Sequence, residues 1–134
     1  METYVLMLQA DPDDKYITES ALEEINPPVP IKFVDSINDA NDFITQEGQP
    51  AVILFNYSGL NRRGYEIVKQ LKTHPSYGHI PVVVLGEVSA DDYIREWYKA
   101  GANSFIIKPS SVAATQKKIR TFFDYWFEVA EVKS

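Results

Sequence analysis

The feature that most constrains the fold of this chain is an unbroken apolar run, Ala51–Phe55, which lies between Pro50 and the polar Asn56. Runs of this length, rich in β-branched and aromatic residues, are typical of strands that are buried on both faces. Such a strand lies inside a parallel sheet and needs helices on both sides. Open α/β sheets bind ligands at the carboxyl ends of their strands. Asn56 therefore occupies a position where a functional side chain is expected.

Apolar runs and helix-start patterns alternate five times along the chain. Besides Ala51–Phe55, strands are predicted at residues 4–8, 31–34, 81–85 and 104–107. Helix starts are predicted at Asp11–Asp14, Ser36–Asp39, Gly64, Ser89–Asp92 and Ser110–Ser111. This alternation predicts a flavodoxin-like three-layer α/β sandwich, with a five-stranded parallel sheet of order 2-1-3-4-5 and five helices. With 134 residues and no repeat or linker, we expect a single domain over residues 1–134 and no output domain.

The composition restricts the class of function. Asp and Glu number 19 against 13 Lys and Arg, which gives a net charge of −6 and argues against a nucleic-acid-binding module. The chain has no cysteine, so neither a disulfide framework nor a thiolate metal site can form. No apolar run is long enough to span a bilayer, and no signal peptide is evident. We therefore expect a cytoplasmic protein that binds neither nucleic acid nor membrane.

The residues that follow the predicted strands resemble those of a response-regulator receiver domain, and the resemblance covers essentially the whole chain. In that family a phosphoacceptor aspartate follows the third strand, eight residues before a glycine that opens a helix; here Asn56 stands eight residues before Gly64. The pair Lys108–Pro109 is similar to the lysine-proline pair after the family's fifth strand. Phe105 matches the position of the family's rotating aromatic switch. The resemblance implies a protein of two-component (phosphorelay) signal transduction.

The same comparison shows where this chain departs from the family. Asn56 replaces the phosphoacceptor aspartate, Gln9 and Ala10 replace an acidic pair, and Gly86 replaces a serine or threonine. Of the usual constellation only Lys108 remains. Phosphoryl transfer to the domain needs a carboxylate nucleophile and a divalent cation held by hard oxygen ligands. The resemblance therefore implies a degenerate phosphoacceptor pocket in a pseudo-receiver, without catalytic residues or a cofactor.

Two alternatives remain open from the residues alone. Asp11 fits a helix start better than a metal site, yet it is a weak candidate metal ligand, so the receiver could still bind metal or accept phosphate through displaced carboxylates. The second alternative is a small flavodoxin-like ligand-binding protein or enzyme. No glycine-rich phosphate loop follows the first strand and no nucleophile–base pair is visible, so we expect no enzyme activity.

The last predicted helix carries more aromatic surface than one sheet face requires. A helix that covers a sheet needs one apolar stripe, and large aromatic side chains are costly to expose. We therefore predict a surface for a protein partner or a homodimer, centred on Trp97, Tyr98, Phe122, Tyr125 and Trp126. The alternative is that the helix end folds back over its own core. This tail resembles that of single-domain regulators that work with bacterial phytochrome kinases, which implies a histidine kinase or another signalling protein as the partner.

Overall fold

The computed structural model describes residues 3–9, 29–57, 63–86, 90–108 and 111–129. One sheet contains five parallel strands: β1 (Val5–Gln9), β2 (Ile31–Val34), β3 (Val52–Asn56), β4 (Val82–Gly86) and β5 (Ser104–Ile107). Their order in the sheet is β2-β1-β3-β4-β5. The predicted flavodoxin-like topology is therefore confirmed, with β3 at its centre.

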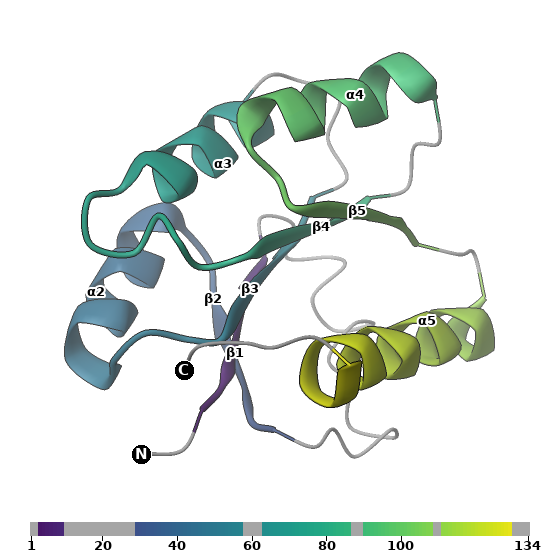
Figure 1. The fold of residues 1–134 in the computed structure, drawn as a ribbon, viewed down its shortest axis with the longest axis horizontal. Helices are drawn as coiled ribbons and strands as arrows, with labels where there is room; N and C mark the ends of the chain where they lie inside the picture. The colour runs from purple at the N-terminus through teal and green to yellow at the C-terminus, as the bar shows by residue number, and fades with distance from the viewer. Residues whose placement is uncertain (1–2, 10–28, 58–62, 87–89, 109–110, 130–134) are drawn as a thin grey trace.

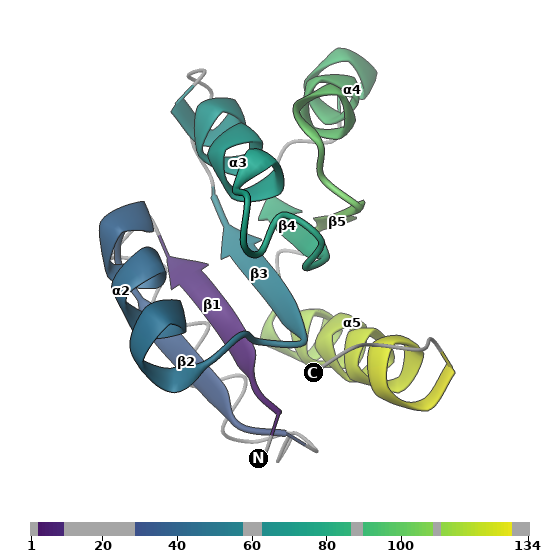
Figure 2. The ribbon, with the colours of Figure 1, turned by 60° about the vertical axis from the view of Figure 1, so that its left-hand side comes forward.

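The described residues form four α-helices rather than the predicted five: α2 (Ile37–Glu47), α3 (Arg63–Thr73), α4 (Asp91–Ala100) and α5 (Val112–Asp124). The helix predicted to start at Asp11 falls on residues 10–28, which lie outside the described part of the chain. Helix α5 continues as one π-helical segment, Tyr125–Val129. Two views of the ribbon show α2, α3 and α4 on one face of the sheet and α5 on the other (Figures 1 and 2).

The helix ends follow the predicted capping chemistry at two of three places. The Ser36 and Ser111 side chains accept hydrogen bonds from backbone N–H groups in the first turns of α2 and α5. Helix α4 differs from the prediction, because Ala90 occupies its N-cap position without a side-chain cap, and Ser89 lies outside the described residues. Gly101 ends α4 at a φ of 115°, a backbone conformation that favours glycine.

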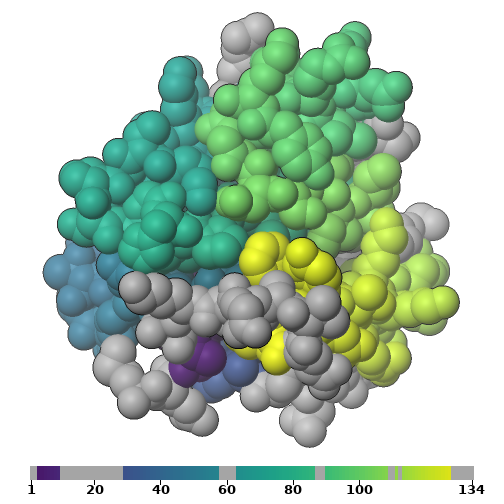
Figure 3. All heavy atoms as spheres, in the orientation of Figure 1, coloured from purple at the N-terminus to yellow at the C-terminus, as the bar shows by residue number. Residues whose placement is uncertain are grey.

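Two hydrophobic cores lie on opposite faces of the sheet, because successive side chains of a strand point to opposite faces. Strands β1, β3 and β4 are buried along their whole length. The core under α2, α3 and α4 includes Leu6, Leu8, Phe55, Val68 and Trp97. The core under α5 includes Met7, Leu54, Ile119, Phe122 and Phe123. In the space-filling view, α3 and α4 form a continuous surface above the yellow end of α5 (Figure 3).

Among the described helices, none has the length and apolarity needed to cross a membrane.

Candidate functional site

Three polar side chains meet at the carboxyl edge of the sheet. Gln9 at the end of β1 and Asn56 at the end of β3 are register partners. The Asn56 Nδ2 donates a hydrogen bond to Gln9 Oε1 at 3.0 Å. Lys108, which follows β5, donates from Nζ to Asn56 Oδ1 at 3.1 Å. The structure therefore brings together three of the five residues predicted for the pocket, and we call this set the polar chain.

Gln9 and Asn56 form the buried, neutral part of the polar chain, and Lys108 is half-buried. Gln9 is 2% exposed and Asn56 is 1% exposed, and they are the buried polar residues among those described. Asn56 uses its carbonyl oxygen toward Lys108 and its amide nitrogen toward Gln9, so both ends of its side chain have hydrogen-bond partners. An amide is neither a nucleophile for phosphoryl transfer nor a strong ligand for a hard cation. At Asn56 and Gln9, hydrogen bonds between amides occupy positions where the family resemblance implies carboxylates.

Gly86, the fourth predicted pocket residue, is in contact with the predicted switch residue Phe105. A Cβ atom at Gly86 would lie 2.8 Å from Cζ and 3.1 Å from Cε2 of the Phe105 ring. Both distances are shorter than an ordinary van der Waals contact, so this ring occupies space that a larger residue at position 86 would need. The sequence shows only that the glycine at position 86 lacks the hydroxyl group of the family's serine or threonine. The structure adds that Phe105 takes up the room.

The Phe105 ring belongs to an aromatic cluster with Trp97 at its centre. Ring centroids lie 6.4 Å apart for Phe105 and Trp97, and 6.0 Å apart for Phe105 and Tyr93. Trp97 also packs against Phe55, Tyr57 and Tyr65, with centroid distances of 5.9, 5.6 and 4.6 Å. These rings come from β3 and its end, α3, α4 and β5. A chain of aromatic contacts therefore connects the switch position to the interior of the domain.

The structure corrects two members of the predicted interaction surface. Trp97 is 0% exposed and Phe122 is 4% exposed, so neither is accessible to a partner of the folded chain. Trp97 packs from α4 into the core above the sheet, and Gly64 of α3 leaves room for its ring: a Cβ at Gly64 would lie 2.4 Å from Trp97 Cη2. Trp126 is half-buried and packs against the core under α5, so most of the helix end folds back over its own core. Tyr98 and Tyr125 remain exposed.

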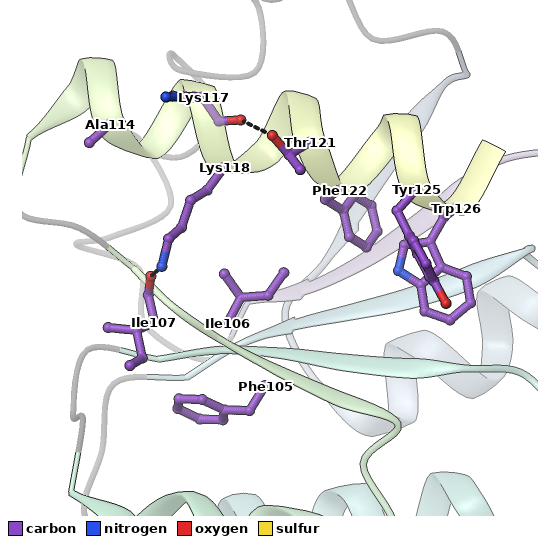
Figure 4. Close-up of a pocket in the computed structure, with 10 residues that line it drawn as sticks. All are labelled: Phe105, Ile106, Ile107, Ala114, Lys117, Lys118, Thr121, Phe122, Tyr125 and Trp126. Atoms are coloured by element: carbon purple, nitrogen blue, oxygen red, sulfur yellow. Dashed lines mark hydrogen bonds between the residues drawn. The ribbon is translucent and has the colours of Figure 1, made fainter. Parts of the chain in front are cut away.

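A groove between β5 and α5 is the feature that the sequence did not reveal. Its volume is about 720 Å³. We define the β5–α5 groove by its lining residues, drawn in Figure 4: Phe105, Ile106, Ile107, Ala114, Lys117, Lys118, Thr121, Phe122, Tyr125 and Trp126. Lys118 Nζ donates to the backbone carbonyl of Ile107 at 2.7 Å and so connects the two walls (Figure 4). The only sequence signal was the aromatic excess of the last helix.

Two of the predicted site residues lie outside the described part of the chain. Ala10 and the weak metal candidate Asp11 both fall on residues 10–28. Within the described ranges, no group of three or more histidine, aspartate or glutamate residues is placed to hold a metal ion. The prediction about Asp11 therefore stays a prediction.

Comparison with known proteins decides the family. The model of the response regulator receiver domain matches residues 5–120. This chain belongs to the response regulator receiver family. The two-component response regulator ORR13 of rice (Oryza sativa subsp. japonica) is 26% identical over 82% of this receiver and 89% of its own length. A receiver of this family takes part in two-component signalling, and receiver domains are signalling modules rather than enzymes.

Solved structures of response regulators have the same fold. A response regulator in red light signalling of R. palustris has a TM-score of 0.83 and 22% identity, over 98% of this receiver and 99% of that chain. The phosphorylated cyanobacterial phytochrome response regulator RcpA has a TM-score of 0.78 and 23% identity, over 100% of both chains. The Mn²⁺-bound response regulator Rcp1 has a TM-score of 0.77 and 20% identity, over 98% and 99%. At this level of identity the likeness supports the receiver fold.

Proposed function

We propose that this receiver signals by binding a protein partner and that its strand-end pocket accepts no phosphoryl group. The observation that carries the proposal is the polar chain, in which the buried Gln9 and Asn56 are bonded to each other and to the half-buried Lys108. An acyl phosphate forms on a carboxylate, and Asn56 offers an amide that is already hydrogen-bonded at both ends. The lysine ammonium, which could pair with a phosphoryl group, instead donates to the Asn56 carbonyl oxygen.

Structural relatives provide the contrast. RcpA was solved in a phosphorylated form and Rcp1 with Mn²⁺ bound. Hard divalent cations are bound mainly by carboxylate and other oxygen ligands, and a cation neutralises charge on the transferring phosphoryl group. Gln9 and Asn56 bring no negative charge to the place where such an ion would bind. We infer that this receiver is a pseudo-receiver within its family.

The proposed partner surface is the face formed by α4, β5 and α5. Tyr98 on α4 and Tyr125 after α5 are 48% and 52% exposed, the two large hydrophobic residues of the described chain that are most accessible. Tyr125 lines the β5–α5 groove, and the Tyr98 hydroxyl accepts a hydrogen bond from the Phe105 N–H of β5, so both tyrosines lie beside this edge strand. Exposed aromatic residues beside an apolar groove are typical of protein contact surfaces. We propose a histidine kinase or another signalling protein as the partner, with a second copy of this chain as the alternative.

The claim that the pocket accepts no phosphoryl group is tested by intact-mass spectrometry of the wild-type protein after incubation with acetyl phosphate and Mg²⁺. We expect no gain of a phosphoryl group, and no saturable Mg²⁺ binding in isothermal titration. A phosphoryl group located on Asp11, Asp13 or Asp14 would establish the displaced-carboxylate alternative and overturn the proposal.

The variant Asn56→Asp separates a lost site from a site that lacks only its nucleophile. We expect this variant to fold, because the new carboxylate can pair with Lys108, whose Nζ lies 3.1 Å from Asn56 Oδ1. Without acidic metal ligands at positions 9 and 10, acetyl phosphate should still fail to modify it. The matched comparison is Asn56→Asp with Gln9→Glu and Ala10→Asp, which should regain Mg²⁺ binding. Rapid phosphorylation of the single variant would show that Gln9 and Ala10 do not limit the chemistry.

A further inference from the structure

We propose that the β5–α5 groove binds an acidic amphipathic helix of a partner protein. The inference rests on the proposed function, since it specifies the chemistry of the partner at the α4–β5–α5 face. Four observations carry it: the apolar lining, the local charge, the covered backbone of the edge strand, and the small apolar surface that a second copy would offer.

The floor of the groove supplies apolar contact area. The half-buried Ile106 and Trp126 and the exposed Tyr125 line it, while Phe122 behind them exposes only 4% of its surface. Its volume is about 720 Å³, and amphipathic helices bind by laying their apolar face into a hydrophobic groove. Apolar side chains that recur at one face of a helix could occupy such a groove without opening the core. The occupant is therefore expected to present an apolar stripe.

The rim of the groove is positively charged in a chain of net charge −6. Lys117 and Lys118 line the groove, and Arg120 is exposed on the same helix. No aspartate or glutamate occurs between Val112 and Phe123. Helix α5 thus carries three positive charges and no negative charge before Asp124. Opposite charges steer association and favour the correct partner, so this rim selects carboxylates.

The edge of the sheet disfavours an extended partner. Among the described strands, β5 pairs with β4 alone, so its other side is an edge where a foreign strand could add. The Phe105 N–H on this strand donates to the Tyr98 hydroxyl oxygen at 3.0 Å, and the Ile107 carbonyl accepts from Lys118 at 2.7 Å. A strand that used these groups would have to displace two side chains. A helix makes its contacts through side chains and needs neither group.

A second copy of this chain fits the groove poorly. Its α4 has Trp97 buried against its own sheet, so it offers mainly Tyr98 as exposed apolar surface. A two-fold contact centred on the part of α5 that lines the groove would bring Lys117, Lys118 and Arg120 of one copy close to the same three residues of the other. Like charges at an interface are unfavourable. These observations favour a partner protein over a homodimer at this groove.

The test measures binding of two designed peptides to the full chain by fluorescence anisotropy. Both peptides are helices of about 16 residues, or four to five turns, with Leu and Phe at positions i, i+3, i+4 and i+7. One carries Glu and Gln at the remaining positions, and the other carries Lys and Gln. We expect saturable binding of the acidic peptide, at least about tenfold tighter than that of the basic peptide, and weakened by salt.

Two sets of variants assign the binding to the groove. K117E/K118E should weaken the acidic peptide about tenfold, because it reverses the charge of the rim. K32E/K69E makes the same change of net charge at exposed lysines of β2 and α3 and should alter the affinity less than about twofold. T121W should also weaken binding, since it places a large ring into the groove without changing its charge. Thermal unfolding of each variant verifies that it is folded.

Equal affinity for both peptides, or equal loss with K117E/K118E and K32E/K69E, would overturn the inference. Self-association in light scattering that T121W abolishes, while neither peptide binds, would assign the groove to a second copy and overturn it too. The same samples are treated with acetyl phosphate and Mg²⁺ and weighed by mass spectrometry. Selective binding of the acidic peptide by a chain that becomes phosphorylated would support the groove and contradict the proposed function. A chain that stays unmodified but does not distinguish the two peptides would support the proposed function and contradict the inference about the groove.

Discussion

The end of the sheet around Asn56 and the groove beside α5 differ in how their side chains are satisfied. At the strand ends, the polar chain and the aromatic cluster fill their own space: Asn56 bonds to Gln9 and Lys108, and Phe105 occupies the room beside Gly86. At the β5–α5 groove, apolar side chains and lysines line an open volume of about 720 Å³. In the first region the chain completes its own contacts, and in the second it leaves contacts to be made.

This difference separates two consequences of mutation. We call the polar chain and the aromatic cluster at the strand ends the closed region. Substitutions there remove contacts that stabilise the folded chain, so they should lower the free energy of unfolding. Substitutions of exposed residues at the groove, such as Lys117 and Tyr125, mainly affect contacts that a partner would complete. They should leave folding almost unchanged and alter binding.

The largest effect is expected from Trp97→Ala. Trp97 is fully buried and contacts five other rings, so its removal should lower the free energy of unfolding by about 3–5 kcal/mol. The control is Tyr125→Ala at the groove. Apart from any change in helix propensity, this variant should lower the free energy of unfolding by less than about 0.5 kcal/mol. Urea unfolding followed by circular dichroism measures both. Similar costs for the two variants would mean that the closed and open regions are not distinct.

The next effect is expected from Asn56→Leu. The substitution keeps a similar volume but removes the donor to Gln9 and the acceptor for Lys108, and it should cost about 2 kcal/mol. Adding Gln9→Leu should recover part of this loss, because replacing both partners of a buried hydrogen bond is much less costly than replacing one. Urea unfolding of the three variants gives the coupling energy. If the two substitutions lower the free energy of unfolding by strictly additive amounts, Gln9 and Asn56 are not energetically coupled.

A smaller effect is expected from Gly86→Thr, the substitution that would restore a hydroxyl residue at the pocket. Its Cβ would approach the Phe105 ring to 2.8 Å, so the ring must move, at a cost of about 1–2 kcal/mol. In the background of Phe105→Ala the same substitution should cost much less. A double-mutant cycle by chemical unfolding provides the comparison. If Gly86→Thr is equally costly with and without the ring, Phe105 is not what fills the space.

The smallest effect on folding is expected from K117E/K118E. Lys118 loses its hydrogen bond to the Ile107 carbonyl, but both lysines are exposed, so the free energy of unfolding should change by at most about 0.5 kcal/mol. The same variant should lose about tenfold in affinity for the acidic peptide. Stability and affinity are measured on one preparation. A large loss of stability would place these lysines in the closed region instead.

Much of the candidate site followed from the sequence. The alternation of apolar runs and helix starts predicted the sheet order, and topology then places the ends of β1, β3 and β5 at one edge. Gln9, Asn56 and Lys108 were predicted to meet there, and they do. Their mutual hydrogen bonds were not predicted, because the pairing of two amides and a lysine depends on distances of a few ångströms between segments far apart in the chain.

The aromatic residues show the limit of sequence reasoning. Trp97 and Tyr98 are neighbours in sequence, and both were assigned to the predicted contact surface, yet one is 0% exposed and the other 48%. The difference depends on which face of α4 turns toward the sheet, and on Gly64 leaving room for the Trp97 ring. Phe122 in α5 and Tyr125 at the start of the π-helical segment differ in the same way, at 4% and 52% exposed. Aromatic content by itself does not distinguish a core from a contact surface.

By itself, the sequence determined the receiver fold and the replacement of a carboxylate by an amide at Asn56, because hydrophobic periodicity and residue chemistry are properties of the chain. Only the tertiary structure decided that Asn56 is bonded at both ends, that Phe105 fills the space at Gly86, and that a groove lies between β5 and α5. The physical reason is that these features are made by packing between distant segments. Packing of this kind is set by volumes and contact distances that appear only when the elements are assembled.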